Sequence, residues 1–184
     1  MNSYKALNKQ IFLSENYSII PIRYEDRFSI MKWRNDQIFH LRQNKLLTEE
    51  SQEKYFTEVI PALFKIKNPD QLLFSFLEND ICIGYGGLVR INWNDKNAEI
   101  SFIMKTELEK NNFEKYWIKY LGLIEELGFD ELRLKKIYVY AFDLRPHLYE
   151  VLEKVNYFLD ARLKSHCKIK NGYKDVVIYS KIKL

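Results

Sequence analysis

A strand, a polar connection and an amphipathic helix follow one another between Ala98 and Phe129, and this stretch constrains the fold more than any other. Residues 98–104 are apolar and β-prone, which predicts a strand. After the polar connection 105–112, apolar residues recur at the spacing of a helix with one buried face: Phe113, Trp117, Tyr120, Leu121, Ile124 and Leu127. Free backbone N–H groups at the start of such a helix can bind an anion such as a pyrophosphate. An ordinary strand–helix unit without a ligand has the same pattern.

Length and composition predict one globular domain. A chain of 184 residues, of which 47% are hydrophobic, can bury a sizeable core and is too apolar to be disordered. We assign residues 17–184 to the domain and residues 1–16 to a loosely attached lead-in. Because the sequence shows no secretory leader and no apolar run of membrane-spanning length, we expect a cytoplasmic protein that does not insert into a membrane.

The charges and cysteines argue against a nucleic-acid partner and against a metal site. The net charge is +4, and lysines and glutamates are interspersed without the basic block that nucleic-acid binders carry. This charge favours only a mild attraction to small anions. Cys82 and Cys167 lack metal-ligand spacing and are interpreted as reduced structural thiols.

The remaining segments predict an alternation of strands and helices. In chain order they are a strand at 17–23, a helix at 25–33, a helix capped by Thr48 that runs to Phe64, strands at 71–78, 81–91 and 98–104, the helix from 113, a strand at 132–141, a helix at 146–155 and a hairpin of 158–169 and 174–183. Short polar turns between the three central strands predict antiparallel neighbours. Phe28 and Met31, with Trp33 as a third candidate, are expected on one side of the first helix. Pro61 is expected to kink the second helix or to end its first part.

A glycine cluster, Gly84-Tyr85-Gly86-Gly87, lies inside one predicted strand. Glycine weakens a strand, so the cluster indicates a bulge or a group that approaches the backbone closely. That group is either a bound ligand or a packed helix, and the residues leave both readings open.

The order of elements resembles the GNAT acetyltransferase fold, and several motifs agree with it. Ala98-Glu99-Ile100-Ser101-Phe102 is similar to the AEIGY-type strand of the ribosomal-protein-acetylating branch. Similar motifs of that branch stand at 127–129, 132–137 and 151–157, and in the tail at Gly172, Asp175 and Tyr179-Ser180. The resemblance implies an α/β (α+β) fold whose mixed, mostly antiparallel sheet of about seven strands is splayed between the fourth and fifth and flanked by helices. It also implies acetyl-CoA or another short acyl-CoA as co-substrate, with no metal.

A closer resemblance is to the nucleotide-linked amino-sugar N-acyltransferases of this superfamily. It is based on Trp33-Arg34-Asn35-Asp36, the segment 41–44, the glycine cluster and the segment 143–146. It implies an acyl-CoA-dependent N-acyltransferase that acts on the amino group of a nucleotide-linked deoxy-amino-sugar. Its substrate-binding residues are then Trp33, Arg34, Asn35, Tyr85, Gly86 and Gly87. The alternatives are a protein N-terminal acetyltransferase and a catalytically weak CoA-binding module. The oligomeric state stays open, with a dimer as one option.

The resemblance also predicts where acyl-CoA binds. The strands 98–104 and 136–141 are expected to separate, so that their free backbone groups bind the pantetheine arm as a missing strand would. Backbone N–H groups of Phe102, Ile103 and Met104 would polarise the thioester carbonyl. The pyrophosphate would lie at Lys110, Asn111, Asn112 and Phe113, although the family's G-x-G is replaced here by Lys110-Asn111-Asn112. Asn112 can adopt the left-handed conformation, although less readily than glycine. Lys110 can supply charge in place of a close approach of the backbone.

Three side chains are candidates for proton transfer. Glu99 is the candidate base, directly or through a water, because a carboxylate with one apolar side can work near neutral pH. It would equally suit a cross-strand ion pair. His40 is the alternative base. The tyrosine that many family members use to protonate the thiolate is replaced by Leu152, and Tyr149, one turn earlier, is the candidate acid or an ordinary core aromatic.

Overall fold

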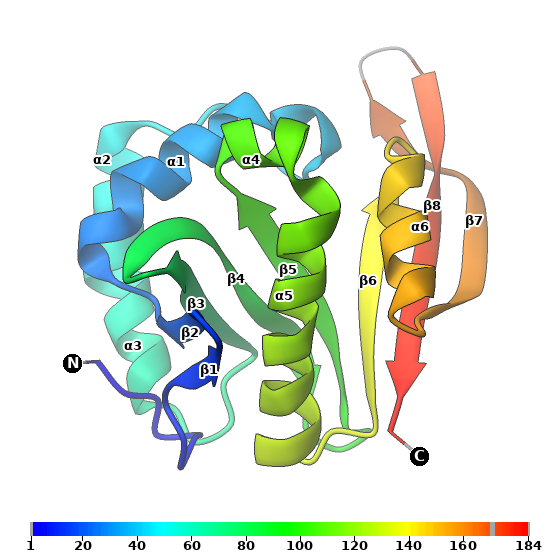
Figure 1. The fold of residues 1–184 in the computed structure, drawn as a ribbon. Coiled ribbons are helices and arrows are strands. Elements are labelled where there is room, and N and C mark those ends of the chain that lie inside the picture. The colour runs from blue at the N-terminus through cyan, green and yellow to red at the C-terminus, as the bar shows by residue number, and fades with distance from the viewer. Residues whose placement is uncertain (1, 170–171, 184) are drawn as a thin grey trace.

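One eight-stranded mixed sheet organises the molecule in the computed structural model, which describes residues 2–169 and 172–183 (Figure 1). The strand order across the sheet is β1-β2-β3-β4-β5-β6-β8-β7. The strands are β1 Phe12–Ser14, β2 Tyr17–Pro21, β3 Gln71–Glu78, β4 Ile81–Asn92, β5 Asn97–Met104, β6 Lys136–Phe142, β7 Phe158–Ile169 and β8 Gly172–Ile182. The predicted central meander and closing hairpin are confirmed as antiparallel pairs. Part of the predicted hairpin turn lies outside the described residues.

The helices cover the two faces of the sheet separately. They are α1 Arg27–Asp36, α2 Glu49–Lys54, α3 Ile60–Lys65, α4 Thr106–Asn111, α5 Phe113–Glu125 and α6 Pro146–Lys154. Helix α5 crosses one face beside α6 (Figure 1). On the other face of the sheet, residues of α1 and α2 line a cavity together with Tyr85 and Ser101. The side chains of Tyr85 and Ser101 point to this face because successive strand residues point to opposite faces.

The N-terminal segment is packed into the core, so the expectation of a loosely attached lead-in is wrong. The hydroxyl of Tyr4 donates to the carbonyl of Leu73 at 2.7 Å and accepts from its N–H at 2.9 Å. The side chains of Tyr4 and Phe12 are fully buried, and β1 adds an outer strand beside β2. Pro21 ends β2 opposite Phe74 of β3 and lies beyond the residues of β2 that pair with β1, so its missing N–H interrupts no pairing with β1.

The first helices agree with the sequence in their caps and differ in one buried residue. Thr48 caps α2 by accepting from the N–H of Ser51 at 3.2 Å, and the two residues form a capping box. A π-helical turn, Tyr55–Val59, precedes α3, so the helix is irregular just before Pro61, as the proline predicts. Phe28, expected to be buried, is 37% exposed, since Ile30 and Trp33 form the buried face of α1.

The polar stretch after β5 is a helix, not a loop. Residues of this stretch form α4, which is joined to α5 at Asn112. The buried face predicted for α5 is confirmed, with Trp117, Tyr120 and Leu121 in the core. Strand β6 begins at Lys136 rather than at 132, because a π-helical turn at Glu126–Glu131 extends α5 first.

Strands β5 and β6 are parallel and pair only at one end. Their register covers Asn97–Glu99 and Lys136–Tyr138, after which they separate. This is the splay that the resemblance implies. It leaves an open gap in the middle of the sheet, with α5 over one face of it (Figure 1).

Candidate active site

The gap between β5 and β6 presents unpaired backbone groups from both strands. The N–H of Lys105 donates to the carbonyl of Ile83 at 2.8 Å, which makes these two residues a hydrogen-bonded antiparallel pair in the β4–β5 register. Because bonded and non-bonded pairs alternate, Ser101 and Ile103 bond to β4. Phe102 and Met104 instead direct their N–H groups into the gap. Of the three predicted carbonyl polarisers, Ile103 is therefore wrongly placed and the other two face the gap.

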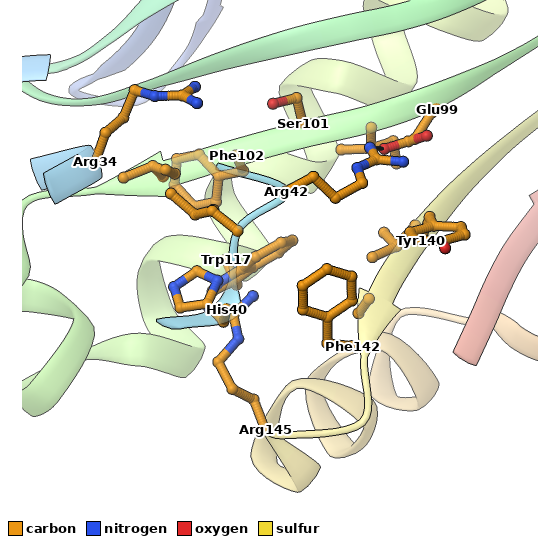
Figure 2. A pocket seen from close by; sticks show the side chains of 15 residues that line it. Arg34, His40, Arg42, Glu99, Ser101, Phe102, Trp117, Tyr140, Phe142 and Arg145 are labelled. Carbon is orange, nitrogen blue, oxygen red and sulfur yellow. Dashed lines mark hydrogen bonds and ion pairs between the residues drawn. The ribbon is translucent and has the colours of Figure 1, made fainter. Parts of the chain in front are cut away.

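A cleft follows this gap through the sheet and encloses a volume of about 100 Å³. Three arginines and one carboxylate provide its charged lining, together with a histidine and several aromatic rings. Figure 2 shows these side chains: Arg34, His40, Arg42, Glu99, Ser101, Phe102, Trp117, Tyr140, Phe142 and Arg145. Free strand groups can pair with the amides of an extended ligand arm, and a cationic lining suits phosphate groups of the same ligand.

Glu99 lies where β5 and β6 begin to separate and is 3% exposed. One carboxylate oxygen, Oε1, accepts from Nη2 of Arg42, and the other, Oε2, is 3.5 Å from Nε of Arg90. The guanidinium of Arg42 also lies 4.6 Å above the ring of Tyr140. The ion pair considered from the sequence is thus present, and the expected apolar side of Glu99 is occupied by two cations. Among the side chains that line the cleft, Glu99 is the single carboxylate.

His40 lines the same cleft but is a poor base. Burial, together with the nearby charge of Arg145, lowers the pKa of its imidazole to about 3. The ring is therefore neutral at physiological pH and has little affinity for a proton. Its Nε2 lies 3.4 Å from Oε1 of Gln37, whose Nε2 donates to the carbonyl of Met104 at 2.8 Å. This chain of contacts fixes the segment after α1 against the end of β5.

Tyr149, the candidate thiolate acid, does not lie among the residues that line the cleft. Its hydroxyl donates to Oδ1 of Asp143 at 2.8 Å, and its ring stacks on Tyr179 with centroids 5.4 Å apart. Burial, with the carboxylate of Asp143, raises the pKa of this hydroxyl. Tyr149 therefore holds α6 to the β6–α6 connection and to β8.

Tyr149→Phe is accordingly expected to leave kcat within about twofold of wild type while lowering stability by about 1 kcal/mol, the contribution of one partly exposed hydrogen bond. In a chain of this length that corresponds to a fall in Tm of about 2–4 °C. Steady-state kinetics and thermal unfolding measure the two effects. A kcat about tenfold or more below wild type would return Tyr149 to the reaction.

A second cavity adjoins the cleft on the α1–α2 face of the sheet. It has a volume of about 340 Å³, and Arg34 and Ser101 line both spaces. The rest of the lining combines apolar residues with tyrosine and amide side chains: Ile22, Ile30, Leu47, Ser51, Gln52, Tyr55, Phe56, Gln71, Leu73, Tyr85 and Val89. The two spaces therefore meet beside Arg34 and Ser101.

The Trp33-Arg34-Asn35-Asp36 segment contributes one residue to this cavity. Arg34 donates to the hydroxyl of Tyr85 and, through Nε, to Gln43 at 2.9 Å. Trp33 is 5% exposed within the core, so it cannot stack on a nucleotide base as expected. Asn35 accepts from the N–H of Leu47 at 2.8 Å and donates to its carbonyl at 2.9 Å. Trp33 and Asn35 do not line the cavity for the same reason: the segment ends a helix, and only one side of that helix end faces the cavity.

The glycine cluster makes room for protein atoms, not for a sugar. A Cβ on Gly86 would lie closer than 3.0 Å to the carbonyl of Ser101 and to the hydroxyl of Tyr120 from α5. A Cβ on Gly87 would lie equally close to the carbonyl of Leu72, and its φ of +148° favours glycine. The packed-helix alternative is therefore correct at Gly86, and of this cluster only Tyr85 lines the second cavity.

The predicted pyrophosphate loop differs from the structure in its geometry. Lys110 and Asn111 are exposed residues at the end of α4. Asn112 has φ −139°, so it does not adopt the left-handed conformation that would replace the family's glycine. Phe113 packs against Trp117 and His147, with ring centroids 5.8 and 4.3 Å away. Of these four residues, Phe113 lies nearest to the cleft lining through Trp117.

Arg42, Tyr140 and Arg145 line the cleft and were not assigned from the sequence. Two of them lie in segments that carried the resemblance, 41–44 and 143–146, but nothing local indicates that their side chains meet in one cleft. Tyr140 belongs to β6, where alternation alone predicts that it shares a face with Tyr138. The splay brings all three to the side chain of Glu99 or His40.

A sheet splayed between parallel central strands, with free backbone groups and an arginine-lined cleft at the opening, defines an acyl-CoA-dependent N-acyltransferase. Residues 19–178 match the family model described as an acetyltransferase (GNAT) domain. The chain belongs to this family, whose members use acetyl-CoA.

Solved structures share the fold at low sequence identity. Spermidine N-acetyltransferase from Vibrio cholerae, in complex with CoA and spermine, is 17% identical with a TM-score of 0.77, over 92% of this chain and 96% of that one. A GNAT-family acetyltransferase from Bacillus anthracis is 16% identical with a TM-score of 0.74, over 94% and 98%. None of the helices among the described residues is long and apolar enough to cross a membrane.

Proposed function

We propose that the chain transfers an acetyl or other short acyl group to the amino group of a nucleotide-linked amino sugar. The observation that carries this proposal is the second cavity, in which Arg34 provides the charge and the described lining contains no Asp or Glu. A guanidinium matches a diphosphate through paired hydrogen bonds. The tyrosines and glutamines of the lining suit the base and sugar of such a ligand.

The same lining disfavours a polyamine acceptor. Spermidine is a polycation, and its binding requires carboxylates to compensate its charge. The cavity offers a cation in that place. The likeness to spermidine N-acetyltransferase concerns the fold, and the acceptor is set by the lining of the cavity, which the fold does not dictate.

The geometry supplies two parts of the reaction. Acyl-CoA, when bound, provides the thioester whose carbonyl carbon the amine attacks; the C–S bond then breaks and CoA leaves as a thiolate that takes its proton from solvent. The N–H groups of Phe102 and Met104, which face the gap, can donate to an oxygen that gains negative charge. The carboxylate of Glu99 can accept the proton of the amine at Oε2, because its nearest cation there, Arg90, is 3.5 Å away, whereas Oε1 is bonded to Arg42.

Arg34→Ala is expected to raise KM for the nucleotide-linked amino sugar by about tenfold to a hundredfold, the effect of losing charge-assisted hydrogen bonds. KM for acetyl-CoA should change by less than about threefold. Lys32→Ala is the matched control, since Lys32 lies on the same helix and pairs with Asp36 away from both cavities. Steady-state kinetics with each substrate varied in turn measure these effects.

The acceptor itself is tested by comparing the linked sugar with the free amino sugar, spermidine and a short peptide. Binding energy from the nucleotide positions the amine, so the free sugar should react far more slowly than the linked form. Equal rates for the two sugars, or a faster reaction with spermidine or the peptide, would contradict the proposed acceptor. The family assignment would stand in either case.

A further inference from the structure

An ion pair joins the two sides of the gap at the end where β5 and β6 are farthest from their pairing. Nη1 of Arg145, just before α6, lies 2.8 Å from Oε1 of Glu109 on α4. The two side chains are only 11% and 14% exposed. In Figure 1, α4 and the start of α6 lie at the same end of the molecule, on either side of the gap. The pair is thus a bridge across the mouth of the cleft.

Arg145 is the member of this pair that lines the cleft. Its side chain points from the start of α6 toward His40 (Figure 2). Its guanidinium carbon also lies 5.8 and 6.0 Å from the ring centroids of Phe113 and Trp117, on the first turns of α5. A cation therefore stands at the helix start where the anionic part of acyl-CoA was expected from the sequence.

In this structure the Arg145–Glu109 bridge blocks access to the free backbone N–H groups of Phe102 and Met104. The cleft encloses about 100 Å³, well below the roughly 300–1,000 Å³ of typical ligand sites. An extended arm that pairs with Phe102 and Met104 must pass between α4 and α6, where Arg145 and Glu109 meet. Because Arg145 is largely buried, losing its partner without a replacement of like charge would leave an unpaired buried cation.

We infer that Arg145 is a phosphate ligand for acyl-CoA, and that its bridge to Glu109 closes the cleft until the diphosphate of the incoming acyl-CoA replaces that carboxylate. The exchange keeps the guanidinium paired throughout and uses the planar fork that matches phosphate oxygens. It also provides a cation in a chain whose family glycines are replaced by Lys110-Asn111-Asn112 and whose connection is the helix α4. Glu109 is then a competitor of the ligand, not a part of its site.

The experiment measures the Kd of CoA by calorimetry for two variants that break the same bridge. Arg145→Ala should weaken binding about tenfold to a hundredfold, because a charge-assisted hydrogen bond to phosphate is lost. Glu109→Gln should tighten binding about two- to fivefold, because the closed population falls while the phosphate ligand remains. Arg145→Lys should lie between wild type and Arg145→Ala, since it keeps the charge without the fork.

The opposite signs separate this inference from a purely structural bridge. A brace that only stabilises the fold predicts that both variants lower Tm and weaken binding together, and that result would overturn the inference. If Arg145→Ala fails to fold, the tighter CoA binding expected for Glu109→Gln and the weaker CoA binding expected for Arg145→Lys still test the inference. As a matched control, Lys181→Ala and Glu125→Gln break a similar half-buried pair, 2.7 Å apart and outside the cleft lining, and should leave the Kd unchanged.

Truncated ligands identify the group that Arg145 binds. With dephospho-CoA, which keeps the diphosphate, the ratio of Kd between Arg145→Ala and wild type should equal the ratio for CoA. With pantetheine, which has no phosphate, Arg145→Ala should bind as tightly as wild type or more tightly, because the closing bridge is removed and no phosphate contact is lost. The assignment to the diphosphate would be contradicted if Arg145→Ala weakened pantetheine binding as much as CoA binding. It would also be contradicted if Arg145→Ala left the Kd of dephospho-CoA unchanged. None of these outcomes depends on the acceptor.

Discussion

Glu99→Gln is expected to reduce kcat by about two to four orders of magnitude, the usual effect of losing a positioned general base. The carboxylate is buried at the point where β5 and β6 separate and is the single acidic side chain that lines the cleft. The other candidate, His40, has a pKa lowered to about 3 and holds a proton too weakly to replace it. The Kd of acetyl-CoA, measured by calorimetry, should change by less than about threefold.

A structural role of Glu99 predicts a different set of results. Glu99 is buried, but its partners Arg42 and Arg90 are 36% and 65% exposed, so Glu99→Gln leaves both cations in contact with solvent and costs little stability. Loss of the ion pairs alone would lower Tm slightly and leave the pH profile of kcat unchanged. Glu78→Gln is the control, because Glu78 accepts from Tyr17 and Tyr116 on another part of the sheet. If kcat and its pH profile match wild type in Glu99→Gln, the base is not Glu99.

The sequence predicted the fold wherever a periodic apolar pattern was long enough. The central meander, α5 and the closing hairpin follow from such patterns. Helix α4 was missed because its residues, Thr106–Asn111, are polar or half-buried and show no apolar face. Its Glu, Leu and Lys residues are good helix formers, and that propensity was the available signal. The packing of Tyr4 was missed because a short segment carries no period at all.

The candidate site was predictable only where it depends on a single strand. Glu99 and Phe102 were chosen by their positions along the strand 98–104 and by the family resemblance, and both line the cleft. The partners of these groups come from distant parts of the chain: Arg42 and Glu99 are separated by 57 positions, and Arg145 and Glu109 by 36. Such contacts depend on how the elements pack, and no local pattern encodes them. This is also why the fold was predicted more completely than the site.

Gly86→Ala is expected to lower stability by about 3 kcal/mol, at the upper end of the effect of overpacking. The added Cβ would lie within 3.0 Å of the Ser101 carbonyl and the Tyr120 hydroxyl. Both belong to rigid neighbours, because Tyr120 donates to that carbonyl at 2.8 Å and stacks on Phe102 with ring centroids 3.8 Å apart. For a chain of this length the fall in Tm is about 6–12 °C, measured by calorimetric or fluorescence unfolding.

Gly122→Ala is the matched control and should have the opposite sign. Gly122 lies in α5 with nothing within 4 Å of the added Cβ, so alanine should raise stability by about 0.5–1 kcal/mol through its higher helix propensity. If the glycines instead made room for a sugar, Gly86→Ala would raise KM for the acceptor and leave Tm near wild type. A Tm within about 2 °C of wild type would therefore contradict the packing role. A sugar site would require empty space next to Gly86, whereas in the structure the Tyr120 side chain of α5 occupies that space.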